Sequence, residues 1–509
     1  MPTMDKFVLD RLDNKGSTVA PPAMPIGEAG TVDLGLVDLM YATLRQDCSE
    51  VFDKAYNYLR GEHLAPHTPL QTDQELEDLQ ARSITNWMPL LVNLPQQISY
   101  VDGYRRGGGS TGASPNERRF SKEYECWQEN RMDARQATVY RAALTYGQSF
   151  IHVNTAHKSG RVKVEVLPTR QTVAFFDDPV NDIRPRVTLT IRTSPTENTP
   201  GLAIFWDDVN RYELNLDEDG VFTRKGEPIP HGLSGCPVIR YTCGPADDEG
   251  NALGVLNNTI YALQDRLNQA CFSTNITADS GAFKVRTASG LEVQFRRDPD
   301  TGDLVLGQDG NPIPVPITVS QAKMLISESP ETKFGQLDET PLAGYLLNED
   351  QATKNLAAIA QFPLHALMGS VSNLSAEALA ALETQFMRLV QSYQTSWGES
   401  HEELFRLMAE ALGDEAGANS YGGEVRWRDM GSKSFASVMD GLGKAAEMLE
   451  VPRRGLWSMI PGLTSGDIED LESMQQDIRT EEVMDPSSPS AASKRERRAS
   501  AEVEIAYAP

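Results

Sequence analysis

The sequence has few cysteines, and no two of them form a C-x-x-C pair. An odd, scattered set without a C-x-x-C motif argues against a disulfide framework and against a zinc site with cysteine ligands. We therefore expect reduced thiols, as in a cytosolic protein. The five cysteines in 509 residues are Cys48, Cys126, Cys236, Cys243 and Cys271.

Long hydrophobic runs are also absent. No stretch approaches the roughly 18 consecutive apolar residues that a membrane-spanning helix requires. The N-terminal sequence MPTMDKFVLDRLDNKGSTVAPP contains no basic region followed by an apolar core, so it does not resemble a secretion signal. We therefore expect no membrane partner and a protein that is made and used in the cytosol.

Positive charge is in short supply. Lysine and arginine total 47 against 72 aspartate and glutamate residues, which gives a formal net charge of -25. This balance disfavours a protein that grips DNA through many phosphate contacts. It is compatible with DNA that slides past, because like charge removes the counterion-release attraction that would hold the polyanion.

Each motif that could indicate catalysis is incomplete. The stretch GGGSTG (Gly107–Gly112) matches G-x-G-x-x-G, but it lacks the preceding strand and following helix that dinucleotide binding needs. The stretch around Lys444 lacks the first glycine and the hydroxyl of a phosphate loop, so we interpret it as an amphipathic helix. His401 in HEELF has no second histidine at the H-E-x-x-H spacing, and we interpret it as a polar helix residue.

Three aspartate pairs are the remaining candidates for a metal site. Asp177–Asp178, Asp207–Asp208 and Asp247–Asp248 all lie beside turn residues in a region rich in strand formers. Solvated turns are the favoured interpretation, and a magnesium site is the alternative. No reaction class emerges, so the sequence predicts neither an enzyme nor a cofactor or metal requirement.

Hydrophobic residues make up 40% of the chain, which is enough for real cores. Helical spacing is found from about 36 to Gly61, and a second helical stretch follows that we expect to be broken at Pro89 and Pro95. Helices then run into a strand at Ser149–Asn154. From 161 to 241, short alternating runs between Pro, Asp and Gly clusters predict an antiparallel β region.

The second half of the chain alternates between helix and short β-like segments. Helical spacing from Leu256 to Cys271 predicts a helix, a Gly- and Pro-rich β-like block follows from Phe283 to about Gly335, and a returning helix is expected over roughly Pro341–Gln361. A long helix follows from the candidate N-cap Ser375. After Gly413 the sequence predicts a short strand and two helical stretches, and from Glu481 a Ser-, Ala- and charge-biased tail that stays disordered.

An apolar loop joins the returning helix to the long helix. Pro363 is expected to end the first helix, and Gly369 provides a turn before the second begins. The side chains between are mostly uncharged, which suits a sleeve that meets DNA without fixing to its phosphates. A buried hairpin whose leucines fill a core is the alternative. On the first interpretation, replacing Leu367 and Met368 by serine leaves folding intact.

Taken together, the order of these elements resembles the portal proteins of tailed bacteriophages, most closely the branch found in long-tailed phages of actinobacteria. The resemblance runs from about 50 to 480. It is carried by the stretches WQENRMDARQATVYRAALTYGQSFIHV, HGLSGCPVIRYTCG, GVLNNTIYALQDRLNQ and IAQFPLHALMGSVSNLSAEALAALETQF.

The resemblance implies an α+β, mainly helical portal fold assembled as a ring. Its expected parts are an N-terminal arm (1–35), a wing that is helical and then β-rich (36–251), a stem helix (252–280), a clip (281–338), a returning stem helix (339–361), a tunnel loop (362–375), a long helix back into the wing (376–413), a crown (414–480) and a disordered tail (481–509). The implied DNA-facing residues of the tunnel loop are Phe362, Pro363, Leu364, His365, Leu367, Met368, Gly369, Val371 and Asn373.

The resemblance also implies a function and partners. It predicts a homo-oligomeric ring of about twelve subunits at one capsid vertex of the virion, assembled in the host cytoplasm. Its implied protein partners are the terminase large subunit, the major capsid and scaffold proteins and a head-completion adaptor protein. Double-stranded DNA is expected to pass non-specifically through the channel during packaging and ejection.

Two other classes remain open on the sequence alone. A nucleotide-dependent DNA-packaging enzyme would need an intact phosphate loop. A capsid or scaffold structural protein would lack the order of helix, β module, helix, loop and long helix.

Overall fold

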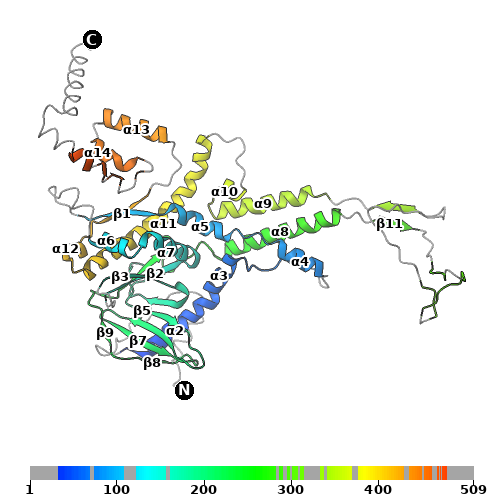
Figure 1. Ribbon diagram of the computed structural model, residues 1–509, viewed down its shortest axis with the longest axis horizontal. Helices are drawn as coiled ribbons and strands as arrows, with labels where there is room; N and C mark the ends of the chain where they lie inside the picture. Colours follow the sequence, from blue (N-terminus) through cyan, green and yellow to red (C-terminus); the bar gives the residue numbers. More distant parts are fainter. Residues whose placement is uncertain are drawn as a thin grey trace, which may run out of the picture.

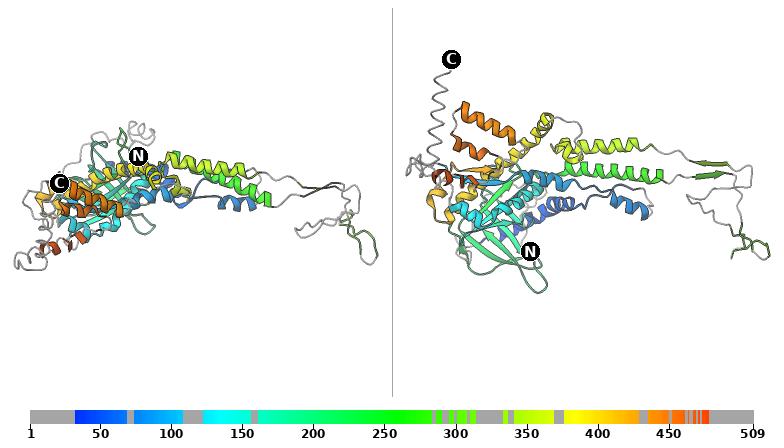
Figure 2. Two further views of the ribbon diagram at one scale, coloured as in Figure 1. Left: turned by 90° about the horizontal axis from the view of Figure 1, so that it is seen from above. Right: turned by 45° about the horizontal axis from the view of Figure 1, so that its top comes forward.

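The computed structural model shows a body of helices and antiparallel sheets from which a two-helix arm projects (Figure 1). The arm consists of α8 (Asn258–Ala282) and α9 (Ala343–Ile359), which lie side by side (Figure 2). Beyond its end, β11 (Arg286–Ser289) pairs with β12 (Lys333–Gln336). The structure describes residues 32–68, 74–107, 122–155, 161–282, 286–289, 295–298, 301–307, 310–313, 333–336, 341–368, 376–428, 435–449, 452–460 and parts of 463–477.

The first helical stretch forms α2 (Leu34–Asp47), a π-helical turn and α3 (Asp53–Arg60) in direct succession. The Asp33 side chain caps the start by accepting a hydrogen bond from the backbone N–H of Gly35 at 2.9 Å. Gly61 ends the stretch in a left-handed conformation with φ of 89°. The predicted stop at Gly61 is therefore confirmed.

The second helical stretch departs from the expectation at one proline. It divides into α4 (Gln74–Arg82) and α5 (Met88–Ile98), and Pro89 lies in the first turn of α5, where its missing N–H is harmless. Pro95 was expected to break the helix, and this is wrong because α5 continues past it to Ile98. The buried apolar side chains of α5 compensate for the proline penalty of about 3 kcal/mol.

The β region contains two antiparallel sheets, as the alternating pattern predicted. In the smaller sheet the order is β10–β2–β3, and in the larger it is β4–β5–β6–β7–β8 with β9 paired to β7. The bounds are β2 Gln148–Asn154, β3 Lys163–Leu167, β4 Thr172–Phe175, β5 Val187–Thr193, β6 Gly201–Trp206, β7 Asn210–Leu216, β8 Phe222–Arg224, β9 Ile229–Pro230 and β10 Val238–Thr242.

The three aspartate pairs form turns. Asp178 accepts hydrogen bonds from the backbone N–H groups two and three residues on, and Asp207 does the same. Asp247 accepts from the backbone N–H groups of Glu249 and Asn251. These hydrogen bonds confirm the turn interpretation. The Asn181 side chain and backbone N–H groups lower the pKa of Asp178, and the backbone N–H of Asn251 is the main cause that lowers the pKa of Asp247. Within the described residues, no group of three or more potential ligands could hold a metal ion.

The long helix α11 (Ala376–Ala411) passes through the body and contacts the small sheet. It also contacts α6 (Lys122–Glu129) and the strand β13 (Glu424–Trp427). Further elements are α7 (Met132–Tyr146), β1 (Val101–Arg105), which pairs with β13, the short helices α10 (Leu364–Met368), α12 (Glu415–Ala418) and α14 (Arg453–Leu456), and α13 (Phe435–Met448).

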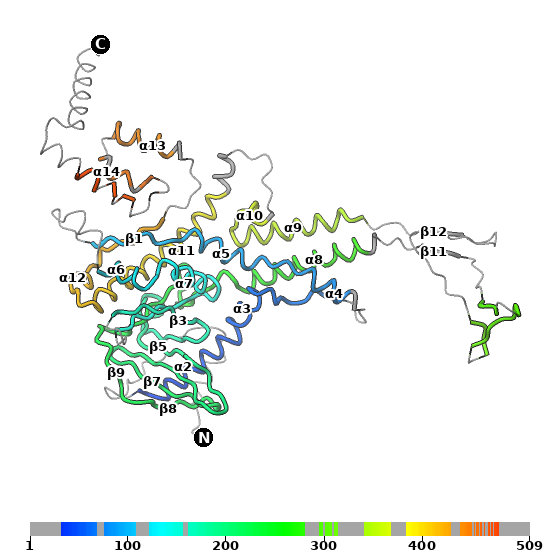
Figure 3. Tube along the Cα trace, viewed as in Figure 1, coloured from blue at the N-terminus to red at the C-terminus, as the bar shows by residue number. Residues whose placement is uncertain are grey.

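The C-terminal helices α13 and α14 lie on the side of the body opposite the six-stranded sheet (Figure 3). Lys444 is part of α13, and its Nζ lies 2.6 Å from Asp440 Oδ2 one turn earlier. The amphipathic-helix interpretation of this stretch is therefore confirmed. Helices and sheets together confirm the predicted α+β class, and no described helix is both long and apolar enough to cross a membrane.

His401 is not the polar helix residue that the sequence suggested. Its side chain is fully buried on α11, where the hydroxyls of Tyr140 and Tyr241 lie 2.6 and 2.9 Å from its two ring nitrogens. Burial lowers the pKa of His401 to about 3, so the ring is neutral in the folded protein. The expectation failed because the two tyrosines that satisfy the ring come from distant parts of the chain.

Candidate DNA-channel loop

The arm leads into the candidate loop through a helix terminus that contains no glycine. Gln361 has a left-handed backbone with φ of 56°. The N–H of Phe362 donates to the carbonyl of Ala357 at 2.9 Å, and that of Gln361 donates to Ala358 at 3.3 Å. This is the Schellman arrangement. Helix α9 thus ends at Ile359, and the expectation that Pro363 ends it is wrong.

Pro363 instead precedes the short helix α10, which forms the first half of the loop. The N–H of Ala366 donates to the carbonyl of Pro363 at 3.0 Å, which closes the first turn. A proline is well suited to this position because its fixed φ matches a helix start and its missing N–H has no helical partner there.

One side of this segment is part of the main hydrophobic core. The rings of Phe362 and Phe386 of α11 lie 4.9 Å apart between centroids. Phe362 and Leu367 are only 6% and 3% exposed, and Pro363 is also buried. These three residues, which were expected to face DNA, are instead buried, and Phe362 and Leu367 belong to the hydrophobic core that also contains Phe386. Their burial corrects that part of the expectation, because a buried side chain cannot contact a ligand directly.

The other side of α10 carries the accessible and polar groups. Leu364 is 37% exposed. His365 lies between the helices, with its Nε2 atom 3.5 Å from Glu383 Oε1 of α11. Its Nδ1 atom is buried without a hydrogen-bond partner among the described residues. Leu364 is therefore the described apolar residue of this loop whose side chain is exposed.

The remaining expected loop residues cannot be placed. Gly369, Val371, Asn373 and the side chain of Met368 lie outside the described residues. Helix α11 begins at Ala376, immediately after the predicted N-cap Ser375. Most of the GGGSTG stretch, residues 1–31 and the tail from Glu481 also lie outside them.

The base of the arm is anchored to the body by polar contacts. The hydroxyl of Tyr58 donates to Asp265 of α8 at 2.8 Å. Gln264 donates to the carbonyl of Thr85 and also bonds Asn268 on its own helix at 2.8 Å. Because Gln264 and Asn268 are fully buried, these bonds fix the rotation of α8 against the body.

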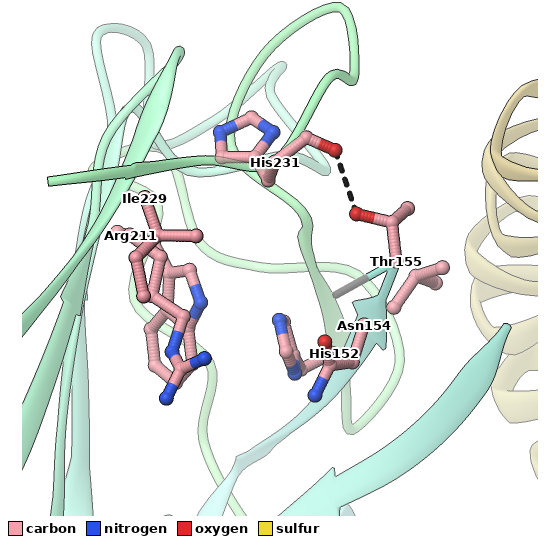
Figure 4. A pocket seen from close by; sticks show the side chains of 8 residues that line it. His152, Asn154, Thr155, Arg211, Ile229 and His231 are labelled. Carbon is pink, nitrogen blue, oxygen red and sulfur yellow. Dashed lines mark hydrogen bonds between the residues drawn. The ribbon is translucent and has the colours of Figure 1, made fainter. Parts of the chain in front are cut away.

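A small cavity lies where the two sheets meet (Figure 4). His152, Asn154 and Arg211 line it, and Thr155 closes its rim by donating to the carbonyl of His231 at 2.6 Å. Its volume of about 10 Å³ matches one water molecule and excludes a cofactor. Burial lowers the pKa of His152, which favours its neutral form, and leaves Arg211 as the charged group named at this cavity.

Comparison with known proteins identifies the family. The family model described as phage portal protein, SPP1 Gp6-like, matches residues 50–483. The portal protein of Mycobacterium phage D29 is 22% identical over 362 residues, which cover 68% of each chain. That of Mycobacterium phage L5 is 21% identical over 417 residues, covering 78% of this chain and 79% of the relative.

Two solved structures show a more distant likeness. The neck of an empty gene transfer agent particle, computed with C6 symmetry, matches 79% of this chain and 97% of its own, at 11% identity and a TM-score of 0.42. The virion of a native gene transfer agent particle matches 81% of this chain and 100% of its own, at 11% identity and a TM-score of 0.40. Because the family model covers most of the sequence, from 50 to 483, this chain belongs to the phage portal protein family.

Proposed function

We propose that copies of this portal protein close into a ring of about twelve subunits at one vertex of the capsid. The family match over residues 50–483 is the observation that carries this proposal. Membership of that family makes the protein a structural component of the virion and not an enzyme. The projecting arm of α8 and α9 supports the ring, because its exposed apolar residues Leu346 and Leu347 are available for contact with a neighbouring copy.

Negative-stain imaging and light scattering of the purified protein test the ring. We expect closed rings, although overexpressed protein can adopt more than one ring size. A stable monomer at every concentration and salt condition, together with the absence of rings from isolated heads, would end this proposal.

The same proposal assigns a path to DNA. We place α10 and the loop that follows it, to 375, at the channel wall, with Leu364 as a direct contact. Uncharged side chains on a strongly acidic protein suit a duplex that carries one charge per roughly 1.7 Å of axis and must move. The burial of Phe362 and Leu367 supports this role, since these residues hold α10 in a fixed position.

Substitution of Leu364 by serine tests the DNA path in a packaging system. We expect rings of normal stability but reduced packaging or retention of DNA. Leu412→Ser is a matched control, because Leu412 is 38% exposed, follows the end of α11 and belongs neither to the arm nor to the loop. Normal packaging by the Leu364→Ser variant would contradict the assignment of α10 to the channel wall.

The proposed partners follow from the family alone. They are the terminase large subunit during packaging, the major capsid and scaffold proteins during head assembly, and the head-completion adaptor before tail attachment. Assembly in the host cytoplasm and later DNA ejection complete the proposal. Pull-down of the purified ring with each partner separately tests these contacts. Failure of the ring to bind the terminase large subunit would contradict the proposed contact during packaging.

A further inference from the structure

A pocket with concentrated positive charge lies on the body at the corner between α6 and α7. Its volume is about 260 Å³. The pocket is lined by four cationic residues and by one carboxylate, that of Glu129. The cationic residues are Arg131, Arg135, Arg161 and Lys163. We call these four cationic residues the basic corner. Such a concentration is unusual in a chain whose net charge is -25, so it needs a specific explanation.

The pocket is held in shape by buried hydrogen bonds. Asn130 donates from Nδ2 to the carbonyls of Cys126 and Val162, at 2.8 and 3.2 Å, and accepts from the N–H of Val164 at 2.9 Å. Arg135 donates to the carbonyl of Val164 at 3.1 Å. These bonds join the helix corner to β3, so the cationic side chains project from a preorganised frame.

The backbone at Arg131 is strained. Its φ of 55° and ψ of 38° place it in the left-handed helical region, which disfavours an ordinary side chain. Asn130, a residue type that tolerates this conformation, occupies the preceding position instead. The residue in this strained conformation, Arg131, is one of those that line the pocket.

The carboxylates of this chain leave part of the basic corner uncompensated. The Oε1 atom of Glu129 lies 3.8 Å from Nη1 of Arg161. The Oε1 atom of Glu165 lies 2.6 Å from Nζ of Lys163. Arg131 and Arg135 have no carboxylate partner among the described residues. Both side chains are exposed and available to an external anion.

DNA in the channel is a poor candidate for that anion. Helix α6, which ends at Glu129 beside the corner, packs against α11 near Phe405, since the ring centroids of Trp127 and Phe405 lie 5.4 Å apart. Phe362, just before α10, packs against Phe386 of the same helix. The intervening stretch of α11 is about 28 Å long at 1.5 Å per residue. The acidic remainder of the surface also repels a polyanion that would have to lie across it.

We propose that the basic corner receives a carboxylate-bearing segment of a second copy of this chain. This inference rests on the proposed ring. A ring joins two different surfaces of the same chain at every interface. With 72 aspartate and glutamate residues per chain, a carboxylate is the commonest anion that a neighbouring copy can present to the basic corner. Strongly acidic subunits repel one another, and a local cationic pocket offsets that repulsion and fixes the register of neighbours.

Charge reversal at the corner tests this contact. The double variant Arg131→Glu/Arg135→Glu is compared with Arg141→Glu, an exposed residue of α7 outside the pocket, by mass photometry across a series of salt concentrations. We expect the double variant to assemble at least about tenfold more weakly at low salt, a difference that corresponds to losing one favourable charge contact. The Arg141→Glu control should assemble like the wild type.

The variant Arg131→Gly separates binding from folding. Glycine relieves the left-handed strain and removes the charge, so its monomer should melt at the same or a higher temperature while its assembly is weaker. Wild-type-like assembly of both corner variants would overturn the inference and leave the ring intact. If the wild type itself never assembles, the ring proposal and this inference fail together.

Discussion

At the residue scale, hydrogen bonding determines the tautomer of the buried His401. The hydroxyl of Tyr140 donates its one proton to Gln136 Oε1 at 3.1 Å, and that oxygen is identified by the backbone N–H of Val101 bonded to it at 2.8 Å. Tyr140 must therefore accept from Nε2–H of His401, and Nδ1 accepts from Tyr241. A neutral ring with both nitrogens satisfied can be buried without an ion partner.

This histidine predicts sensitivity to acid. Its pKa is about 3 in the folded protein and near 6.5 when unfolded, so the unfolded state binds the extra proton between these values. The contribution of the neutral ring to the free energy of unfolding is fully present above about pH 6.5. It is lost as the pH falls toward 3, and the free energy of unfolding then decreases by roughly 1.4 kcal/mol per pH unit. The variant His401→Phe should lose this part of the pH dependence.

Urea unfolding at pH 7 and pH 5 measures the difference. At pH 7 we expect His401→Phe to be less stable by about 1–3 kcal/mol, since Tyr241 loses its buried acceptor. His67→Gln, at an exposed position, controls for the removal of a histidine. Equal pH dependence of the wild type and His401→Phe would contradict the buried neutral ring.

At the element scale, the turn from α9 into α10 depends on Gln361. Replacing Gln361 by glycine should stabilise the protein by up to about 1 kcal/mol, because glycine adopts positive φ without strain. The same substitution at Gln351, in the middle of α9, should cost about 1 kcal/mol. Thermal unfolding measures both. A loss of stability at both positions would contradict the left-handed helix terminus.

The two faces of α10 should differ sharply in stability. Leu367→Ala should cost about 2–5 kcal/mol because the side chain is fully packed. Leu364→Ser should change the free energy of unfolding by no more than about 0.5 kcal/mol. Chemical denaturation of both variants measures this contrast, and similar costs at the two positions would show that α10 is packed differently. The double substitution of Leu367 and Met368 by serine cannot test the channel role by itself, because loss of the Leu367 side chain also removes core packing.

Local patterns predicted those features that nearby residues determine. Alternation in the β region, the stop at Gly61 and the start of α11 after Ser375 all depend on nearby residues, and each agrees with the structure. Pro95 inside α5 and left-handed Gln361 could not be foreseen, because tertiary packing overrides local preference at both. For the same reason, the sequence could not distinguish Leu367, which is buried, from the exposed Leu364.

At the scale of the whole molecule, the acidic balance and the projecting arm have complementary consequences. A net charge of -25 per chain keeps a moving polyanion from adhering to the wall. The same charge makes copies repel, so assembly must depend on packing of the arms and on local cationic sites such as the basic corner. Raising salt should therefore strengthen contacts between apolar arms while weakening the corner contact.

The most direct test of the central claim is a cryo-electron microscopy map of the ring purified from DNA-filled heads. The account predicts about twelve copies around a closed channel, with α10 on the inner wall and the Leu364 side facing the DNA density. It also predicts a carboxylate of the neighbouring copy within the basic corner. A ring in which α10 lies on the outer surface, away from the DNA, would contradict the account.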